Sequence, residues 1–274
     1  MKYCINTLMF SSKLDIFKKI KISSMAGFEG IEPWINEIEN ENSKDIVKCM
    51  NDNKISITTI TGLFGWFEND GQLMNVTDDH HAITDECKRR LELGAKINCP
   101  YAVSAPSFSH RNHFANWQQG IDRYSELIDI GKSIGCMPTL EFIGQTSQIN
   151  NFFLCEKFLK DVKKESKMII DSYHLWRGGG STDDFKNYDP NKISVFHISD
   201  ANKNIPRTQH MDRNRVMPLD GQIDLMLFAR TIKKINYNGF VNIGVYNKCL
   251  WSLNPLEMAT NAFKKLHEVF DQNS

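Results

Sequence analysis

Short apolar runs alternate with longer amphipathic segments along the whole chain. The short runs are rich in β-branched and aromatic residues, which is typical of strands, and the longer segments repeat apolar residues at helical spacing. This alternation predicts an α/β protein with parallel strands and crossover helices. We expect strands at Tyr3–Asn6, Gly30–Glu32, Ser56–Thr61, Tyr101–Ser104, Thr139–Phe142, Met168–Asp171, Ile193–Ile198 and Phe240–Val245.

Each expected strand is followed by a segment with helical spacing. Eight such units in 274 residues predict one (β/α)₈ TIM barrel domain spanning residues 1–274, since this fold typically needs about 250 residues. An open doubly wound sheet is the alternative, but no G-x-G-x-x-G follows the first strand, as its dinucleotide-binding version would require. The clearest expected helices are Ser43–Asn53 with Ser43 as N-cap, Asp78–Lys96, Phe114–Ile134, Ile149–Lys164, Ile223–Ile235 and Pro255–Phe270, with a shorter one near Thr182–Tyr188 and long loops at 62–77, 105–112 and 199–221.

Polar side chains stand at the ends of three consecutive expected strands: Glu141, Asp171 and His197. A single buried polar group usually finds only hydrogen bonds, but burying an ionisable group is costly unless it is paired or binds a metal. Three of them at matching strand ends lie where barrel enzymes place their active sites. Carboxylate and imidazole ligands without thiolate suit Mn²⁺, Mg²⁺, Co²⁺ or Zn²⁺. The pattern therefore predicts a site for one divalent metal ion.

Composition and charge narrow the class of partner. The 33 basic and 33 acidic residues give a net charge of zero, which argues against sequence-independent binding of nucleic acid. No apolar run is long enough to cross a membrane, and the N-terminus lacks the pattern of a signal peptide. The seven cysteines are scattered without a CxxC, as in reduced cytosolic proteins. We therefore expect a cytoplasmic protein that binds a small molecule, and neither nucleic acid nor membrane.

Six segments of the chain are informative: GFEGIEPW (27–34), TLEFIG (139–144), IIDSYHLWRGG (169–179), VFHISD (195–200), NRVMPLDGQIDL (214–225) and NGFVNIGVYN (238–247). They resemble segments of xylose isomerase-like barrels, most closely of the 2-keto-myo-inositol isomerase type. The resemblance implies a metal-dependent isomerase or epimerase that transfers a proton next to the carbonyl of an inosose or keto sugar. Members are often dimers or tetramers, so a homo-oligomer is one expectation.

The resemblance also implies roles for individual residues. Glu141, Asp171 and His197 would bind the metal, Glu141 and His174 would act in catalysis, and His174 and Arg215 would contact substrate oxygens. Aromatic residues after strands two, three and six either pack in loops or form an apolar wall of the substrate pocket, since pockets are mostly lined by such residues. They are Trp34, Phe64, Trp66 and Trp176.

One position departs from the family pattern. Gly244 stands where the resemblance places a fourth ligand, a Glu on strand eight that also serves in proton transfer. The chain has then lost this chemistry, or uses a one-base reaction, or belongs to a subgroup in which strand eight contributes nothing. Asp200, His210 or Asp212 from the loop after strand seven are candidate replacements.

Three alternatives to a sugar isomerase follow from the same observations. A ligand-binding homologue without catalysis is favoured by Gly244, and a lyase resembling 3-dehydroshikimate dehydratase would use similar enolate chemistry. A DNA-repair barrel resembling endonuclease IV would need a His-rich site for several zinc ions and a basic face. The zero net charge argues against this last alternative.

Overall fold

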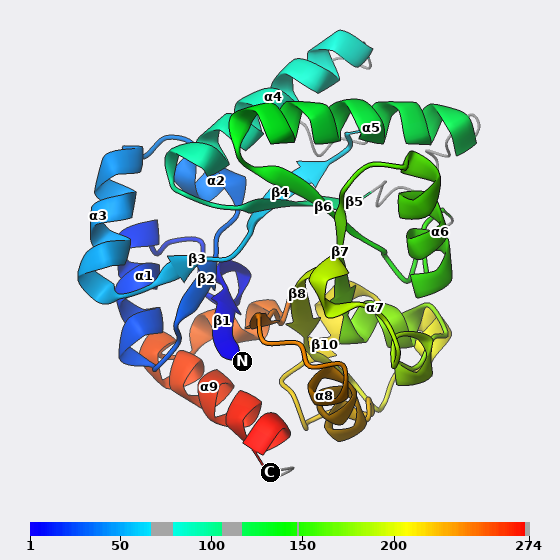
Figure 1. Ribbon diagram of the computed structural model, residues 1–274. Helices are drawn as coiled ribbons and strands as arrows, with labels where there is room; N and C mark the ends of the chain where they lie inside the picture. Colours follow the sequence, from blue (N-terminus) through cyan, green and yellow to red (C-terminus); the bar gives the residue numbers. More distant parts are fainter. Residues whose placement is uncertain (67–78, 106–116, 147, 272–274) are drawn as a thin grey trace.

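Parallel strands form a barrel wall that helices surround (Figure 1). The computed structural model describes residues 1–66, 79–105, 117–146 and 148–271. The strands follow the order β3-β2-β1-β11-β8-β7-β6-β5-β4, which confirms the expected barrel. Their bounds are β1 Lys2–Asn6, β2 Gly30–Glu32, β3 Ser56–Ile57, β4 Ile60–Phe64, β5 Tyr101–Ala105, β6 Met137–Glu141, β7 Lys167–Asp171, β8 Ile193–Ile198 and β11 Phe240–Ile243.

The third expected strand, Ser56–Thr61, is divided in two. β3 pairs with β2, whereas β4 pairs with β5, so the two pieces share one position in the wall. The Thr61 N–H donates to the Pro33 carbonyl at 2.9 Å, and a parallel bridge joins Trp34 to Thr61. These contacts bring the two ends of the sheet together. The chain is kinked between β3 and β4, so the same segment pairs with β2 at one end of the sheet and with β5 at the other.

Most helices form where helical spacing predicts them, with local differences at their ends, but the short helices Ile35–Ile38 and Ser172–Arg177 were not expected. Asn42, not Ser43, caps its helix by accepting from Lys44 N–H, and the region near Thr182–Tyr188 holds only a 3₁₀ turn. The expected loops at 62–77 and 105–112 lie largely outside the described residues. The helices are α1 Ile16–Met25, α2 Ile35–Ile38, α3 Ser43–Asn53, α4 His80–Lys96, α5 Trp117–Ile134, α6 Phe152–Val162, α7 Ser172–Arg177, α8 Leu225–Lys234 and α9 Pro255–Asp271, and the 3₁₀ turns are Thr7–Met9, Thr182–Asp184, Pro190–Lys192, Arg207–Gln209, Asp212–Asn214 and Lys248–Ser252.

Two apolar layers hold the barrel together. The larger lies between the wall and the helices, and a small cluster that includes Val103, Ile169 and Val195 fills the inside. Successive side chains of a strand point to opposite faces, so the residues two positions after Ile169 and Val195 also face inward. These residues are Asp171 and His197, which places them above the inner cluster at the carboxyl ends of their strands. Among the described helices, none is long and apolar enough to span a membrane.

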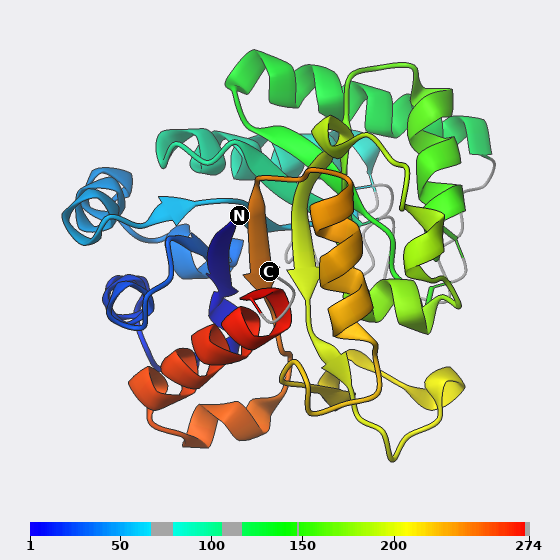
Figure 2. The ribbon, with the colours of Figure 1, turned by 60° about the horizontal axis from the view of Figure 1, so that its bottom comes forward.

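The loop that follows β8 folds back over these strand ends. Its two short strands, β9 Asp200–Ala201 and β10 Arg215–Val216, pair in antiparallel fashion. Figure 2 shows this yellow loop beyond the arrowheads of β8 and β11. The hairpin carries Arg215 back to the barrel mouth, although it lies far beyond the end of β8 in the sequence.

Candidate active site

A cavity of about 770 Å³ opens at the carboxyl ends of the strands. Its volume falls within the range of small-molecule sites. All of the residues that the sequence predicts as metal ligands, catalytic groups or oxygen contacts line it. They are Glu141, Asp171, His174, His197 and Arg215.

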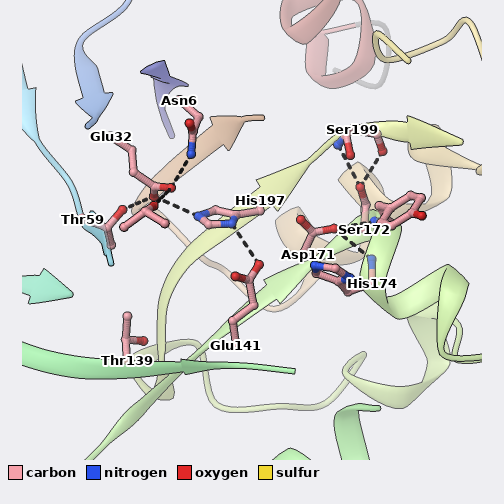
Figure 3. A network of polar contacts seen from close by, with 12 residues as sticks. Asn6, Glu32, Thr59, Thr139, Glu141, Asp171, Ser172, His174, His197 and Ser199 are labelled. Atoms are coloured by element: carbon pink, nitrogen blue, oxygen red, sulfur yellow. Dashed lines mark hydrogen bonds and ion pairs between the residues drawn. The ribbon is translucent and has the colours of Figure 1, made fainter. Parts of the chain in front are cut away.

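A chain of hydrogen bonds crosses the barrel mouth from Glu32 through His197 to Glu141 (Figure 3). His197 Nε2 lies 3.0 Å from Glu32 Oε2, and His197 Nδ1 lies 3.1 Å from Glu141 Oε1. Burial lowers the pKa of His197, but the two flanking carboxylates raise it well above its ordinary value.

Glu32 is a site residue that the strand-end analysis did not select. It is fully buried at the end of β2, and it accepts hydrogen bonds from Asn6 Nδ2 at 2.6 Å, from Thr61 at 2.9 Å and from Thr59. Burial raises its pKa, but His197 and the two threonine hydroxyls outweigh burial and hold the pKa below its usual value. A Glu between Ile31 and Pro33 at a strand end is the same signal that marked Glu141.

Asp171 and Arg215 form the second half of the site. Asp171 caps α7 by accepting from the Tyr173 and His174 N–H groups at 2.6 and 2.9 Å, and its other oxygen accepts from Arg215 at 2.7 Å. Although burial raises the pKa of Asp171, the charge of Arg215 holds it far below its ordinary value. Arg215 also donates to Asp212 at 2.7 Å. One guanidinium thus balances two carboxylates.

His174 is positioned by the first turn of α7. Burial and then the nearby Arg215 charge lower its pKa, so the ring is neutral. Arg215 Nη2 lies 2.9 Å from His174 Nε2, and this nitrogen accepts because a guanidinium can only donate. The pair presents an imidazole and a guanidinium to the same region of the cavity, as oxygen-binding groups would require.

The structure assembles a candidate metal-binding triad from Glu141, Asp171 and His174. Ligand atoms of these three buried residues all lie within 4.8 Å of one another. Two carboxylates and one imidazole form a donor set that fits a divalent ion. The imidazole differs from the expected His197, which contacts Glu141 but turns its other nitrogen to Glu32. Glu141 and Asp171 belong to both candidate sets.

Gly244 lines the cavity without offering a ligand. A Cβ built at this position would meet Asn6 Cβ at 3.5 Å, an ordinary contact, so a side chain has room there. Of the three loop residues considered as replacements, only Asp212 lines the cavity. Asp200 instead accepts from the backbone of Gly221 and Ile223, and His210 is fully buried against Trp176.

The four aromatic candidates divide into two pairs. Trp34 and Phe64 line the cavity, and their rings pack together at 5.8 Å between centroids. Trp66 and Trp176 do not line it, so the expectation of a pocket wall fails for them. Gly65 has a φ of +78°, a conformation that favours glycine, and the turn places Trp66 against Tyr124 and Phe158 in the outer core. Trp176 packs against Tyr173 and His210.

The family model described as xylose isomerase-like TIM barrel matches residues 20–269. The chain belongs to this family. Inosose isomerase of Bacillus licheniformis is 26% identical over 194 residues, which are 69% of each chain. Inosose isomerase of Bacillus velezensis is 21% identical over 271 residues, covering 96% of this chain and 94% of the relative. A crystal structure of the IOLI protein with a bound zinc atom superposes with a TM-score of 0.88 at 21% identity over 99% of both chains.

Proposed function

We propose that this chain is a divalent-metal-dependent isomerase or epimerase that transfers a proton next to the carbonyl of a keto sugar or inosose. The observation that carries the proposal is the grouping of Glu141, Asp171 and an imidazole in the lining of a cavity that Arg215 also lines. Curated relatives named inosose isomerase support the reaction class and the polyol substrate. The barrel mouth supplies the buried carboxylate, the oxygen-binding groups and the space that this chemistry needs.

The residues divide the reaction between them. Glu141 takes the proton from the carbon next to the carbonyl and returns it, because its buried carboxylate lines the cavity and can act as general base and acid. Arg215 and His174 bind substrate oxygens and orient the ring. Glu141, Asp171 and either His174 or His197 would hold a divalent ion, which when bound would polarise the carbonyl. Trp34 and Phe64 exclude water from one side.

Metal content and proton exchange test the proposal together. Protein purified without chelator and titrated with Mn²⁺, Co²⁺ and Zn²⁺ is expected to bind one equivalent. It should then exchange a substrate proton for solvent deuterium with at least one member of a panel of keto-inositols, ketohexoses and 3-dehydroshikimate. Dehydration of 3-dehydroshikimate would instead identify a lyase. Lack of metal binding or exchange across the panel would contradict the isomerase proposal.

The same titration decides which imidazole binds the ion. His174→Ala and His197→Ala each remove one candidate ligand, and the true ligand is the one whose loss weakens metal affinity more, since affinity follows the number of ligands. The triad of Glu141, Asp171 and His174 favours His174, whereas the family resemblance favours His197.

A ligand-binding homologue without turnover is the second candidate, and Gly244 is the observation that favours it. If the missing carboxylate silenced the chain, Gly244→Glu is expected to raise metal affinity by about tenfold or more and to create or increase proton exchange. Tyr246→Glu is a matched control, because it adds the same charge two residues further along the cavity lining. A folded Gly244→Glu protein that gains neither property would show that this position alone did not remove the activity.

A further inference from the structure

Glu32 is surrounded by groups that donate hydrogen bonds. Asn6 turns its amide nitrogen to Glu32 Oε1 because its own oxygen already accepts from Leu8 N–H at 2.9 Å and from Trp34 Nε1–H at 3.3 Å. The hydroxyls of Thr59 and Thr61 point to the same carboxylate. An ionised carboxylate only accepts, so the remaining neighbour, His197 Nε2, must also donate.

This arrangement dictates how the His197 ring is oriented. Its Nε2–H is directed to Glu32, away from the grouping of Glu141 and Asp171, while Nδ1 faces Glu141 at 3.1 Å. We propose that Glu32 is a positioning residue that fixes the proton of His197 on Nε2 and so leaves Nδ1 as the nitrogen offered to the metal centre. The inference rests on the proposed metal-dependent function. Carboxylates that hold a metal-binding histidine through its second nitrogen commonly tune the affinity of such sites.

The variant Glu32→Gln distinguishes a positioning role of Glu32 from that of a purely structural ion pair. The Asn6 amide cannot turn, so the introduced glutamine must present its carbonyl to Asn6 and its NH₂ group to Thr59 and His197. The Thr59 hydroxyl can accept from this group, and His197 Nε2 must then accept as well. The ring then carries its proton on Nδ1, so the nitrogen that faces Glu141 has no lone pair for a metal ion.

Exchanging the amide and the carboxylate between positions 6 and 32 should return the ring proton of His197 to Nε2. In the double variant Asn6→Asp/Glu32→Gln, the introduced aspartate accepts from the NH₂ group of the introduced glutamine, whose carbonyl turns back to His197. The total charge equals that of the natural chain. Thr61→Val is a matched control, because it removes one donor to Glu32 and leaves the contact with His197 intact.

Two measurements test the proposal on folded protein. In metal-free protein, ¹⁵N spectra of the histidine rings, assigned with His197→Gln, should show Nε2 protonated in the natural chain, unprotonated in Glu32→Gln and protonated again in the double variant. Zinc affinity, measured by competition with a chromophoric chelator, should fall about 10- to 100-fold in Glu32→Gln, recover in the double variant and stay nearly unchanged in Thr61→Val.

Several outcomes would overturn the inference. One is an unprotonated His197 Nε2 in the natural chain, which can be observed whether or not any variant folds. Another is a folded Glu32→Gln protein that keeps natural zinc affinity, and a third is a folded double variant that recovers neither the ring protonation nor the affinity. A natural chain that binds no zinc but shows the predicted ring protonation would contradict the metal-dependent function and the role of Glu32 in it, while leaving the hydrogen-bond assignment intact.

Discussion

Replacing Glu141 with glutamine is expected to lower kcat/KM for substrate proton exchange by about 10²- to 10⁴-fold, the usual contribution of a positioned general base. Glutamine keeps the shape of the side chain, and its amide can still hydrogen-bond to His197 Nδ1, which lies 3.1 Å from the Glu141 carboxylate. What it loses is the negative charge and the ability to take a proton. Deuterium incorporation into substrate measures the effect directly, and metal loading is checked on the same sample.

Thr139→Val is the matched control for this variant. Thr139 lies two residues earlier on β6 and also faces the barrel interior, but its hydroxyl bonds Ser194 and the Lys167 carbonyl and does not line the cavity. Its replacement should leave kcat/KM nearly unchanged. Proton exchange in a metal-loaded Glu141→Gln protein at a rate within about tenfold of the natural chain would exclude Glu141 as the base.

The alternation of apolar and polar positions was sufficient to predict the barrel and the strand ends that carry its site. Asp171 and His197 occupy paired positions on β7 and β8, as expected for inward-facing residues at matching ends of neighbouring parallel strands. The same period of two applies to Glu32 at the end of β2, which was expected on a strand but was not predicted as a site residue. Its pairing with Asn6 in the wall became visible only with the register.

Other features depend on geometry that a linear pattern does not contain. Which nitrogen of His197 faces Glu141 follows from the donors packed around Glu32, which come from β1, from β4 and from the segment between β3 and β4. Trp176 stands after a strand end, as Trp34 does. However, α7 begins directly at Ser172, and its helical turn carries the indole away from the cavity. Sequence distance alone could not distinguish these two tryptophans.

Replacing Arg215 with methionine is expected to lower the free energy of unfolding of the metal-free protein by about 3–5 kcal/mol, the usual cost of leaving a buried charge without its partner. Arg215 is 7% exposed, and its guanidinium donates to Asp171, Asp212 and Ser199. Methionine fills similar space but leaves the two carboxylates facing each other without a counter-charge. Urea unfolding in the presence of a chelator at neutral pH measures the loss.

The pH dependence of this difference identifies its origin. Arg215 opposes the effect of burial and lowers the pKa of Asp171, so the stability it contributes is present above the unfolded pKa of about 3.9 and is lost as pH falls toward the lower folded value. The difference in free energy of unfolding between the natural chain and the variant should therefore become smaller in acid. Because a divalent ion can replace the missing positive charge, saturating metal should restore part of the stability of Arg215→Met.

Arg89→Met separates this buried network from ordinary surface ion pairing. The Arg89 side chain is 43% exposed and pairs with Glu86 and Glu39, and exposed pairs contribute only about 0–1 kcal/mol. If Arg215→Met loses no more free energy of unfolding than Arg89→Met, water or rearranged donors satisfy Asp171 and Asp212 without the guanidinium. A much larger loss that metal partly reverses would show that one buried cation is needed to hold the two carboxylates together, and that a bound ion can share this role.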